Sequence, residues 1–365
     1  MTNPLQSKNN QQQTSRLQQW LENIWYQGSK GYIVLLPLSA IYCVLNALQR
    51  WLKSPKINSL PCPVIVVGNI TVGGTGKTPL TLKVVALLQK AGYKPAIITR
   101  GYGGKSPQSL PVRVASKMSP TEVGDEAVLM ASRSGVPVYV GADRVATIKK
   151  LLDEHDCDVI VSDDGMQHYK LPRDIQIAVI DQSRQLGNGW CLPAGPLREP
   201  KQRLVGCDFI VVNGLETMTE KKPTYTASVP EFGMQLSGKQ LINLKTKQEK
   251  PLTAFVGETV NAVSGIGNPQ RFFDTLQNAG LTMNTQSFPD HHPFTASDFT
   301  HQNTHSIIMT EKDAVKCQSF ATESMWYLPV TATLDGAFES VFLNRLAQKF
   351  ESRSYALDKK WIKNG

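Results

Sequence analysis

Short apolar runs alternate with amphipathic stretches along most of the chain after residue 60. Helical periodicity is clear in PLTLKVVALLQKAG and ADRVATIKKLLDEH, which lie between such runs. The apolar runs are rich in β-branched residues and typical of buried strands; they occupy residues 63–68, 94–100, 136–141, 157–164, 175–181 and 207–213. Buried strands that alternate with helices predict an α/β fold, in which a mostly parallel sheet is flanked by helices.

The first 55 residues have a different pattern. Residues 1–15 are polar and rich in Gln and Asn, which predicts a disordered N-terminus. Residues 31–48 carry no charge over eighteen positions, close to the minimum length for crossing a bilayer. We expect a membrane-associated helical segment over residues 16–55, because aromatic and then basic residues flank the apolar stretch. A spanning helix, a helix that lies in the membrane interface and a buried core helix all stay open.

The pattern changes again after residue 225. Residues 226–250 are polar and Lys-rich, which predicts a linker or a short hairpin between domains. A second, smaller α/β pattern follows over residues 251–365 and ends in the helical stretch FESVFLNRLAQKFES. With a first domain over residues 56–225, the 365-residue chain is expected to hold two domains, since one core seldom grows past a few hundred residues.

Charge and cysteine content narrow the class of protein. The net charge of +9 favours an acidic partner, which could be a nucleic acid, an anionic membrane or a phosphorylated substrate. Nucleic acid is the weakest of these, because the basic residues are scattered and no binding motif accompanies them. The six cysteines lie far apart without a Cys-x-x-Cys pair, so neither a zinc site nor a disulfide framework is indicated. A reducing cytoplasm is the expected environment.

A glycine-rich loop between the first apolar run and a helical stretch carries the clearest chemistry. Its sequence, TVGGTGKT, differs from the Walker A pattern only at the first position, where Thr71 replaces glycine. In such a loop, backbone N–H groups and a helix N-terminus surround phosphate oxygens. Lys77 would reach the terminal phosphates and the Thr78 hydroxyl would bind Mg²⁺. We expect nucleotide binding by Thr71, Val72, Gly73, Gly74, Thr75, Gly76, Lys77 and Thr78.

Two adjacent carboxylates, Asp163 and Asp164, follow the apolar run DVIVS. Sheets of this kind bind ligands at the carboxyl ends of their strands, and carboxylates are costly there unless they are solvated, paired or metal-bound. Either aspartate is expected to hold Mg²⁺, which predicts Mg-nucleotide phosphoryl chemistry. Water as acceptor would indicate an NTPase or switch, whereas a substrate hydroxyl would indicate a kinase with a base. The candidate bases are Asp125, Glu126, His168, Asp290, His291 and His292.

Seven motifs in a fixed order add a resemblance to a known family. VVGNITVGGTGKTP, ITRGYGG, VGDE, SDDGMQH, PAGPLRE, FPDHHPFT and MTEKDAVK, behind an apolar N-terminal helix, closely resemble the tetraacyldisaccharide 4'-kinases of lipid A biosynthesis. The resemblance covers nearly the whole chain from about residue 30, and Thr at the first loop position is usual in that family. It implies a P-loop NTPase-like fold with ATP and Mg²⁺ as cofactors. It also implies γ-phosphate transfer to the 4'-hydroxyl of an acylated glucosamine disaccharide 1-phosphate, which forms lipid IVA.

The resemblance also implies where the enzyme acts and with which partners. Its place would be the cytoplasmic face of the bacterial inner membrane, with the lipid substrate and the membrane surface as partners. No nucleic acid and no obligate protein partner are expected. The alternative is a membrane-tethered nucleotide switch, which shares both phosphate-binding elements but would not need lipid or His291.

The family's catalytic aspartate corresponds to Asp125 in VGDE, and its partner histidine to His291 in DHHPF, with His292 as the alternative. Such a pair would come from two domains, so that domain closure would assemble it. The carboxylate would orient the imidazole and strengthen it as a base, although the proton could leave through either group. Residues near the phosphates, Mg²⁺ or the lipid are expected at Arg100, Tyr102, Glu126, Arg144, Gln167, His168 and Arg198.

Overall fold

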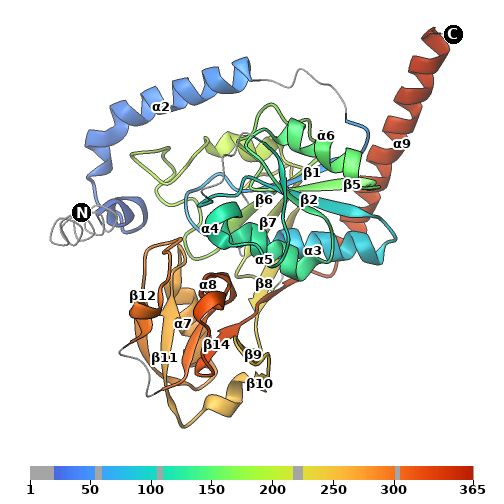
Figure 1. Cartoon of the computed structure of the whole chain (residues 1–365). Helices are drawn as coiled ribbons and strands as arrows, with labels where there is room; N and C mark the ends of the chain where they lie inside the picture. Colours follow the sequence, from blue (N-terminus) through green and yellow to red (C-terminus); the bar gives the residue numbers. More distant parts are fainter. Residues whose placement is uncertain (1–19, 54–59, 105–109, 217–224, 301–304, 365) are drawn as a thin grey trace, which may run out of the picture.

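Two sheets organise the protein. The computed structural model describes residues 20–53, 60–104, 110–216, 225–300 and 305–364. The segment 1–15, predicted to be disordered, lies outside these residues. Figure 1 shows the larger sheet with its helices above the smaller one, and α2 along the outside of the larger unit.

The larger sheet has the strand order β15-β8-β7-β6-β1-β5-β2-β4-β3. Its seven inner strands are parallel, and the short edge strands β3 and β15 are antiparallel to their neighbours. All six apolar runs predicted as strands lie in this sheet, and the predicted α/β fold is confirmed. The strands are β1 (Val64–Gly68), β2 (Pro95–Thr99), β3 (Val112–Arg113), β4 (Val138–Val140), β5 (Val159–Asp163), β6 (Ile175–Asp181), β7 (Phe209–Asn213), β8 (Glu231–Ser237) and β15 (Thr331–Leu334).

Helices cover both faces of this sheet, which explains why its strands are apolar on both sides. Ile65 and Val67 of β1 face the core under α3 (Lys77–Lys90), α5 (Asp125–Ser134) and α9 (Phe338–Asn364). Val64 and Val66 face the opposite core, to which α6 (Arg144–Glu154) contributes. The short helix α4 (Pro120–Val123) precedes α5, and a 3-10 turn η1 (Lys201–Gly206) precedes β7.

The smaller sheet has the strand order β10-β9-β14-β13-β11-β12. Helix α7 (Pro269–Asn278) packs beside β11 and β12, and α8 (Glu311–Cys317) packs beside β13 and β14. Two apolar clusters fill the space between these helices and the sheet. The strands are β9 (Gln240–Asn243), β10 (Glu249–Pro251), β11 (Thr259–Ser264), β12 (Thr282–Ser287), β13 (Ile307–Thr310) and β14 (Met325–Leu328), with the 3-10 turns η2 (Leu252–Phe255), η3 (Ala296–Phe299) and η4 (Gln318–Phe320).

The domain boundaries differ from those expected. Residues 226–250, predicted to be a linker or a short hairpin, contain β8 of the larger sheet and the antiparallel pair β9 and β10 of the smaller one. The chain then returns to the larger sheet with β15 and α9, so residues 251–365 are not one separate domain. The polar composition of the predicted linker reflects half-exposed strands, in which only alternate or central residues are buried.

Helix α2 (Tyr32–Leu52) lies within the predicted membrane-associated segment. It is long and apolar enough to cross a membrane by length and composition alone, which is weak evidence for membrane association. Most of its surface is uncovered, which excludes a helix buried in the core. Six exposed apolar side chains recur every three or four residues and so form one stripe, which Ile33, Val44 and Trp51 widen; the six are Val34, Leu38, Ile41, Leu45, Leu48 and Leu52.

Replacing Phe338 by Ala tests the return of the chain to the larger sheet. Phe338 is fully buried at the start of α9 and packs edge-on against Phe209 and Phe232. The cavity left behind should lower the free energy of unfolding by about 3–5 kcal/mol in a denaturant titration. The exposed neighbour Val341→Ala is the matched control and should change it by less than about 0.5 kcal/mol. Equal, small effects of both changes would contradict the packing of α9 on this sheet.

Candidate active site

The glycine-rich loop has a shape that two of its glycines make possible. Gly73 and Gly76 have φ angles of 94° and 93°, in the left-handed region that other residues rarely adopt. A Cβ at Gly76 would lie 2.4 Å from Nδ2 of Asn213, whose amide donates to the carbonyl of Thr75 at 3.0 Å. The loop therefore closes on the end of β7 and leads into α3 with its backbone fixed.

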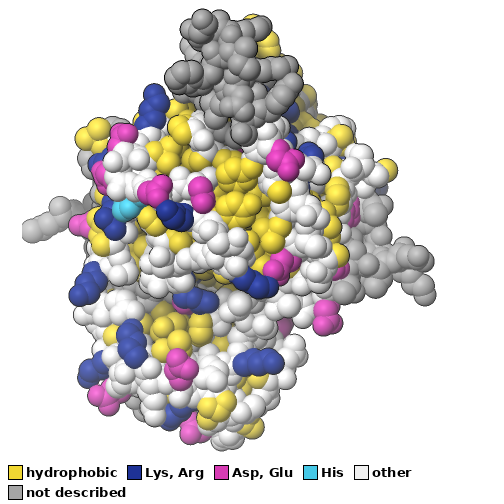
Figure 2. Space-filling model, turned by 90° about the vertical axis from the view of Figure 1, so that its right-hand side faces the viewer, with side chains coloured by type: hydrophobic (Ala, Val, Ile, Leu, Met, Phe, Trp, Pro, Cys, Tyr) yellow, Lys and Arg dark blue, Asp and Glu magenta, His cyan; other side chains and the backbone are white. Residues whose placement is uncertain are grey.

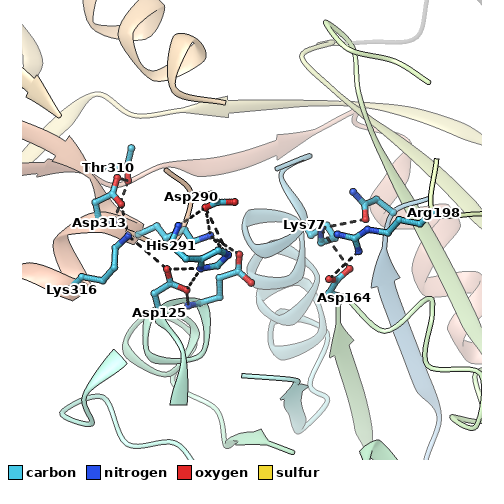
Figure 3. Close-up of polar contacts among 12 residues, drawn as sticks. Lys77, Asp125, Asp164, Arg198, Asp290, His291, Thr310, Asp313 and Lys316 are labelled. Atoms are coloured by element: carbon cyan, nitrogen blue, oxygen red, sulfur yellow. Dashed lines mark hydrogen bonds and ion pairs between the residues drawn. The ribbon is translucent and has the colours of Figure 1, made fainter. Parts of the chain in front are cut away.

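Lys77 and the carboxylates after β5 meet beside this loop. Lys77 Nζ lies 3.4 Å from Asn69 Oδ1 and 3.6 Å from Asp164 Oδ1. Arg198 Nη1 lies 3.5 Å from the other carboxylate oxygen of Asp164. Figure 3 shows these three charged side chains pointing toward one another. The fully buried Asp163 accepts a hydrogen bond from Thr81, one turn into α3, at 2.7 Å.

The two aspartates have opposite electrostatic environments. Burial, and then the nearby charge of Glu126, raises the pKa of Asp163 to about 7. Burial also acts to raise the pKa of Asp164, but the charges of Lys77 and Arg198 lower it overall. Arg144 is buried beside the pair and donates to the Asp163 carbonyl at 3.4 Å, and burial lowers the pKa of its guanidinium to about 10.

The donor set around these aspartates fits Mg²⁺. Asp163 Oδ2 and Asp164 Oδ1 are buried and make no hydrogen bond. Among the described residues, no group of three or more His, Cys, Asp or Glu side chains gathers that could hold a metal by itself. Mg²⁺ usually takes only one or two carboxylates and completes its shell with phosphate oxygens and water, so two aspartates and the Thr78 hydroxyl are the right kind of ligands.

A second cluster of polar side chains joins the unit of the larger sheet to the unit of the smaller sheet. His291 Nδ1 lies 3.1 and 3.0 Å from the two carboxylate oxygens of Asp125, the first residue of α5. Burial acts to raise the pKa of Asp125, but the hydrogen bond from His291 and the charge of Lys312 lower it overall. Burial acts to lower the pKa of His291, and the hydrogen bond to Asp125 outweighs it, so the pKa is raised. The structure brings together the two residues proposed as a pair.

Lys312, at the start of α8, was not singled out from the sequence. Its Nζ lies 3.0 Å from Glu126, 3.3 Å from Asp290 and 3.4 Å from His291 Nε2. Burial acts to lower the pKa of Lys312, but these carboxylates raise it well above its usual value. An ammonium group can donate to Nε2 only while the imidazole is neutral with its ring proton on Nδ1, facing Asp125.

Lys316, one turn further along α8, was also missed. It contacts Asp313 at 2.7 Å and Asp125 at 3.9 Å. Both lysines belong to MTEKDAVK, which contributed only to the resemblance. A signal was present, since charged residues follow a buried strand there, but the sequence does not show which partners they meet.

His292 lies in a different environment from His291. Its Nε2 is 3.3 Å from Asp298, and its ring stacks on Phe288 at 4.6 Å between centroids. It is therefore held within the smaller sheet's unit and does not reach Asp125. His168 has an unpaired buried Nε2, and burial, followed by the charge of Arg144, lowers its pKa to about 4.

The remaining predicted residues surround these two groups. Gln167 donates to the carbonyl of Asn69 and to Glu199, both at 2.9 Å. Tyr102 is exposed, and its ring lies 5.0 Å from that of His291, whereas Arg100 is exposed without a hydrogen bond of its own among the described contacts.

Two arginines beside the loop were not predicted. Arg184 lies over the Tyr26 ring at 5.5 Å, with Nη1 next to Gly73. Arg271 of α7 pairs with Asp181 at 3.0 Å and with Asn213 at 2.9 Å. Neither belongs to a recognisable motif, so only the fold shows their position.

The Walker A loop between β1 and α3, the carboxylates after β5 and a parallel sheet with helices on both faces define a P-loop phosphotransferase. The family model described as tetraacyldisaccharide-1-P 4'-kinase matches residues 32–347. The chain belongs to this family. Curated relatives and a solved structure are similar to this chain as well.

Two curated relatives, both named tetraacyldisaccharide 4'-kinase, match over nearly their full length. One, from Methylobacillus flagellatus, is 44% identical over 91% of this chain and 97% of its own length. The other, from Actinobacillus succinogenes, is 45% identical over 89% of this chain and 98% of its own. A crystal structure of the "apo" form of LpxK from Aquifex aeolicus in complex with ATP superposes with a TM-score of 0.72. It is 31% identical in sequence and covers 86% of this chain and 99% of the other.

A pair of glycine substitutions tests the loop. Gly76→Ala places a side chain at a left-handed residue and against Asn213, and should weaken MgATP binding about 5- to 30-fold, because about 1–2 kcal/mol of backbone strain is added. Gly336→Ala, outside the loop, is the matched control, because a Cβ there meets open space and its backbone is not in the left-handed region. Titration with a fluorescent ATP analogue measures both affinities, and equal affinities would show that the left-handed residue is not needed.

The titration of His291 tests its two neighbours. The charge of Lys312 lowers the pKa of His291 and Asp125 raises it. Lys312→Met should therefore raise this pKa, so that the imidazole stays protonated to higher pH, and Asp125→Asn should lower it. NMR titration of the imidazole measures both shifts. The exposed Lys245→Met should leave the titration unchanged, and a fall in pKa for Lys312→Met would contradict the assigned contact.

Proposed function

We propose that the protein transfers the γ-phosphate of ATP to the 4'-hydroxyl of a tetraacyldisaccharide 1-phosphate, forming the bis-phosphorylated lipid A precursor lipid IVA. The observation that carries the proposal is the contact between Asp125 and His291, from two different structural units, next to a complete phosphate-binding loop. A nucleotide switch that activates water has no need for such a pair. Family membership, shown by the match over residues 32–347, supports the same reaction.

In this mechanism the loop backbone and Lys77 bind the ATP phosphates, and Lys77 exchanges Asp164 for phosphate oxygens. Thr78 and Asp163 or Asp164 would hold Mg²⁺, which neutralises charge that develops on the transferred group. The raised pKa of Asp163 agrees with this role, since a buried carboxylate without a cation resists ionisation. Arg198 lies 3.5 Å from Asp164, close enough to contact a phosphate bound beside that carboxylate.

The Asp125–His291 pair accepts the proton of the lipid hydroxyl. His291 donates from Nδ1 to Asp125, keeps that carboxylate ionised and fixes its direction. Lys312 neutralises Glu126 and Asp290 around the pair, so that three carboxylates can lie close together. Tyr102, whose ring lies tilted beside that of His291 and is largely exposed, is in position to contact the sugar.

The position of α2 supports a membrane-surface location rather than a spanning helix. Ser39 and Asn46 contact the body of the protein, and they are about 10 Å apart along the helix. The middle of α2 is therefore held against the P-loop unit and cannot cross a hydrocarbon core, whereas its exposed apolar stripe suits the interface. We place the enzyme on the cytoplasmic face of the bacterial inner membrane, where its lipid substrate is accessible.

The charge distribution agrees with a lipid more than with a nucleic acid. On the face shown in Figure 2, basic and acidic side chains are interspersed over both units. Nucleic-acid binding requires basic residues gathered along one face. The net charge of +9 is therefore explained more simply by an anionic lipid and an anionic surface.

Transfer of labelled γ-phosphate from ATP to tetraacyldisaccharide 1-phosphate in detergent micelles tests the proposal. Lys77→Ala, Asp125→Ala and His291→Ala should each lower kcat at least about a hundredfold, because positioning and base catalysis typically contribute that much. His292→Ala is the matched control and should keep most of the activity, since His292 does not reach Asp125. ATP hydrolysis without labelled lipid, unaffected by His291→Ala, would instead establish a nucleotide switch.

A further inference from the structure

The side of α2 opposite its apolar stripe contacts the loop between residues 191 and 198. Ser39 Oγ donates to the carbonyl of Cys191 at 2.8 Å. Tyr42 and Asn46 both donate to the carbonyl of Arg198, at 3.0 and 2.6 Å. These three residues recur at intervals of three and four, so one face of the helix carries all of them. Two of the three contacts converge on a single carbonyl oxygen.

Asn46 is itself held in place. The hydroxyl of Tyr169 donates to Asn46 Oδ1 at 2.7 Å, which leaves the amide nitrogen to face Arg198. Asn46 is therefore oriented from one side by the loop after β5 and contacts the 191–198 loop on the other. An apolar residue could pack at this position, but it could not fix the direction of the Arg198 carbonyl.

The same loop is bonded to the Walker A loop. The backbone N–H of Arg198 donates to the carbonyl of Ile70 at 2.6 Å, and that of Val72 donates to the carbonyl of Pro196 at 2.9 Å. Thr71 and Leu197 form a β-bridge between them. The first residues of the phosphate-binding loop are thus paired with the segment that α2 holds by its carbonyl groups.

The side chain of Arg198 extends this connection to the catalytic charges. Its guanidinium lies 3.5 Å from Asp164, which lies 3.6 Å from Lys77. Arg198 therefore contacts α2 through its carbonyl, the Walker A loop through its N–H, and the carboxylate after β5 through its guanidinium. A shift of α2 relative to the body would move all three contacts together.

We propose that Tyr42 and Asn46 are positioning residues for the nucleotide site, which they set through the backbone of Arg198. Helix α2 then has two separate faces with separate tasks. The apolar stripe contacts the lipid surface, and the polar face holds the Walker A loop and Arg198 in the geometry that binds MgATP. The inference rests on the proposed function for its lipid surface, but its effect on nucleotide binding is independent of the phosphate acceptor.

The test compares variants of the two faces in the full-length protein. The double variant Tyr42→Phe/Asn46→Leu removes both donors to Arg198 and should weaken MgATP binding about tenfold, measured with a fluorescent ATP analogue. Its sedimentation with vesicles of phosphatidylethanolamine and phosphatidylglycerol should match the wild type. Leu45→Ser/Leu48→Ser, on the exposed stripe, should reverse this pattern, with weaker vesicle binding and an unchanged affinity for MgATP.

Two single variants separate positioning from general stability. Tyr42→Phe alone removes one hydroxyl, keeps the ring and the Asn46 donor, and should give an intermediate loss of MgATP affinity. Ser39→Ala removes a donor to the same loop but not to Arg198, and should change MgATP affinity less than twofold. The inference would be overturned if Tyr42→Phe and Tyr42→Phe/Asn46→Leu both kept the wild-type affinity for MgATP. It would also be overturned if variants lost MgATP affinity only when they lost vesicle binding as well. Weaker MgATP binding in a protein that phosphorylates no lipid would instead support the inference and reject the proposed kinase activity.

Discussion

The structure depends on burying polar side chains where four parallel strands end at one edge of the larger sheet. Asn69, Asp163, Asp181 and Asn213 follow or end β1, β5, β6 and β7, and all four are buried. A buried polar group without a partner costs about 1–3 kcal/mol, so each must find one. Their partners come from the Walker A loop, from α3 and from Arg271 of the smaller unit. The same requirement therefore shapes the phosphate loop and holds the second unit beside it.

The connections of the chain between the two units also help to hold the smaller unit beside the larger one. The smaller sheet is inserted between β8 and β15, which pair with each other at the edge of the larger sheet. Both connections between the units therefore leave the same edge of the larger sheet. Side-chain contacts near the site hold the two units together elsewhere. Those contacts are charged or polar, as in Arg133 with Glu311 at 2.7 Å and His291 with Asp125. Because Asp125 and His291 belong to different units, their contact exists only while the units adjoin.

The sequence predicted the elements well and the connections between them poorly. Apolar runs located six strands of the larger sheet. A strand that is buried on both faces is a continuous apolar run in the sequence, so it can be predicted without knowing its neighbours. The strands β8 and β9 lie in a segment whose sequence predicts only a linker or a short hairpin, since their half-exposed residues resemble those of a polar loop. Motifs identified the Walker A loop and the two members of the Asp125–His291 pair. Lys312 was missed, because its importance arises from three carboxylates that converge only in the fold.

The distances within the site suggest why it can exchange its internal ion pairs for a nucleotide. Charge-assisted hydrogen bonds are normally about 2.7–2.9 Å long. Arg133 and Glu311, which join the two units away from the phosphate loop, reach that length. Asp164 instead lies 3.6 Å from Lys77 and 3.5 Å from Arg198, so neither cation is held at the optimal distance. A phosphate group would offer these cations closer oxygens and would free Asp164 to bind Mg²⁺, so nucleotide binding would replace weak internal contacts with stronger ones.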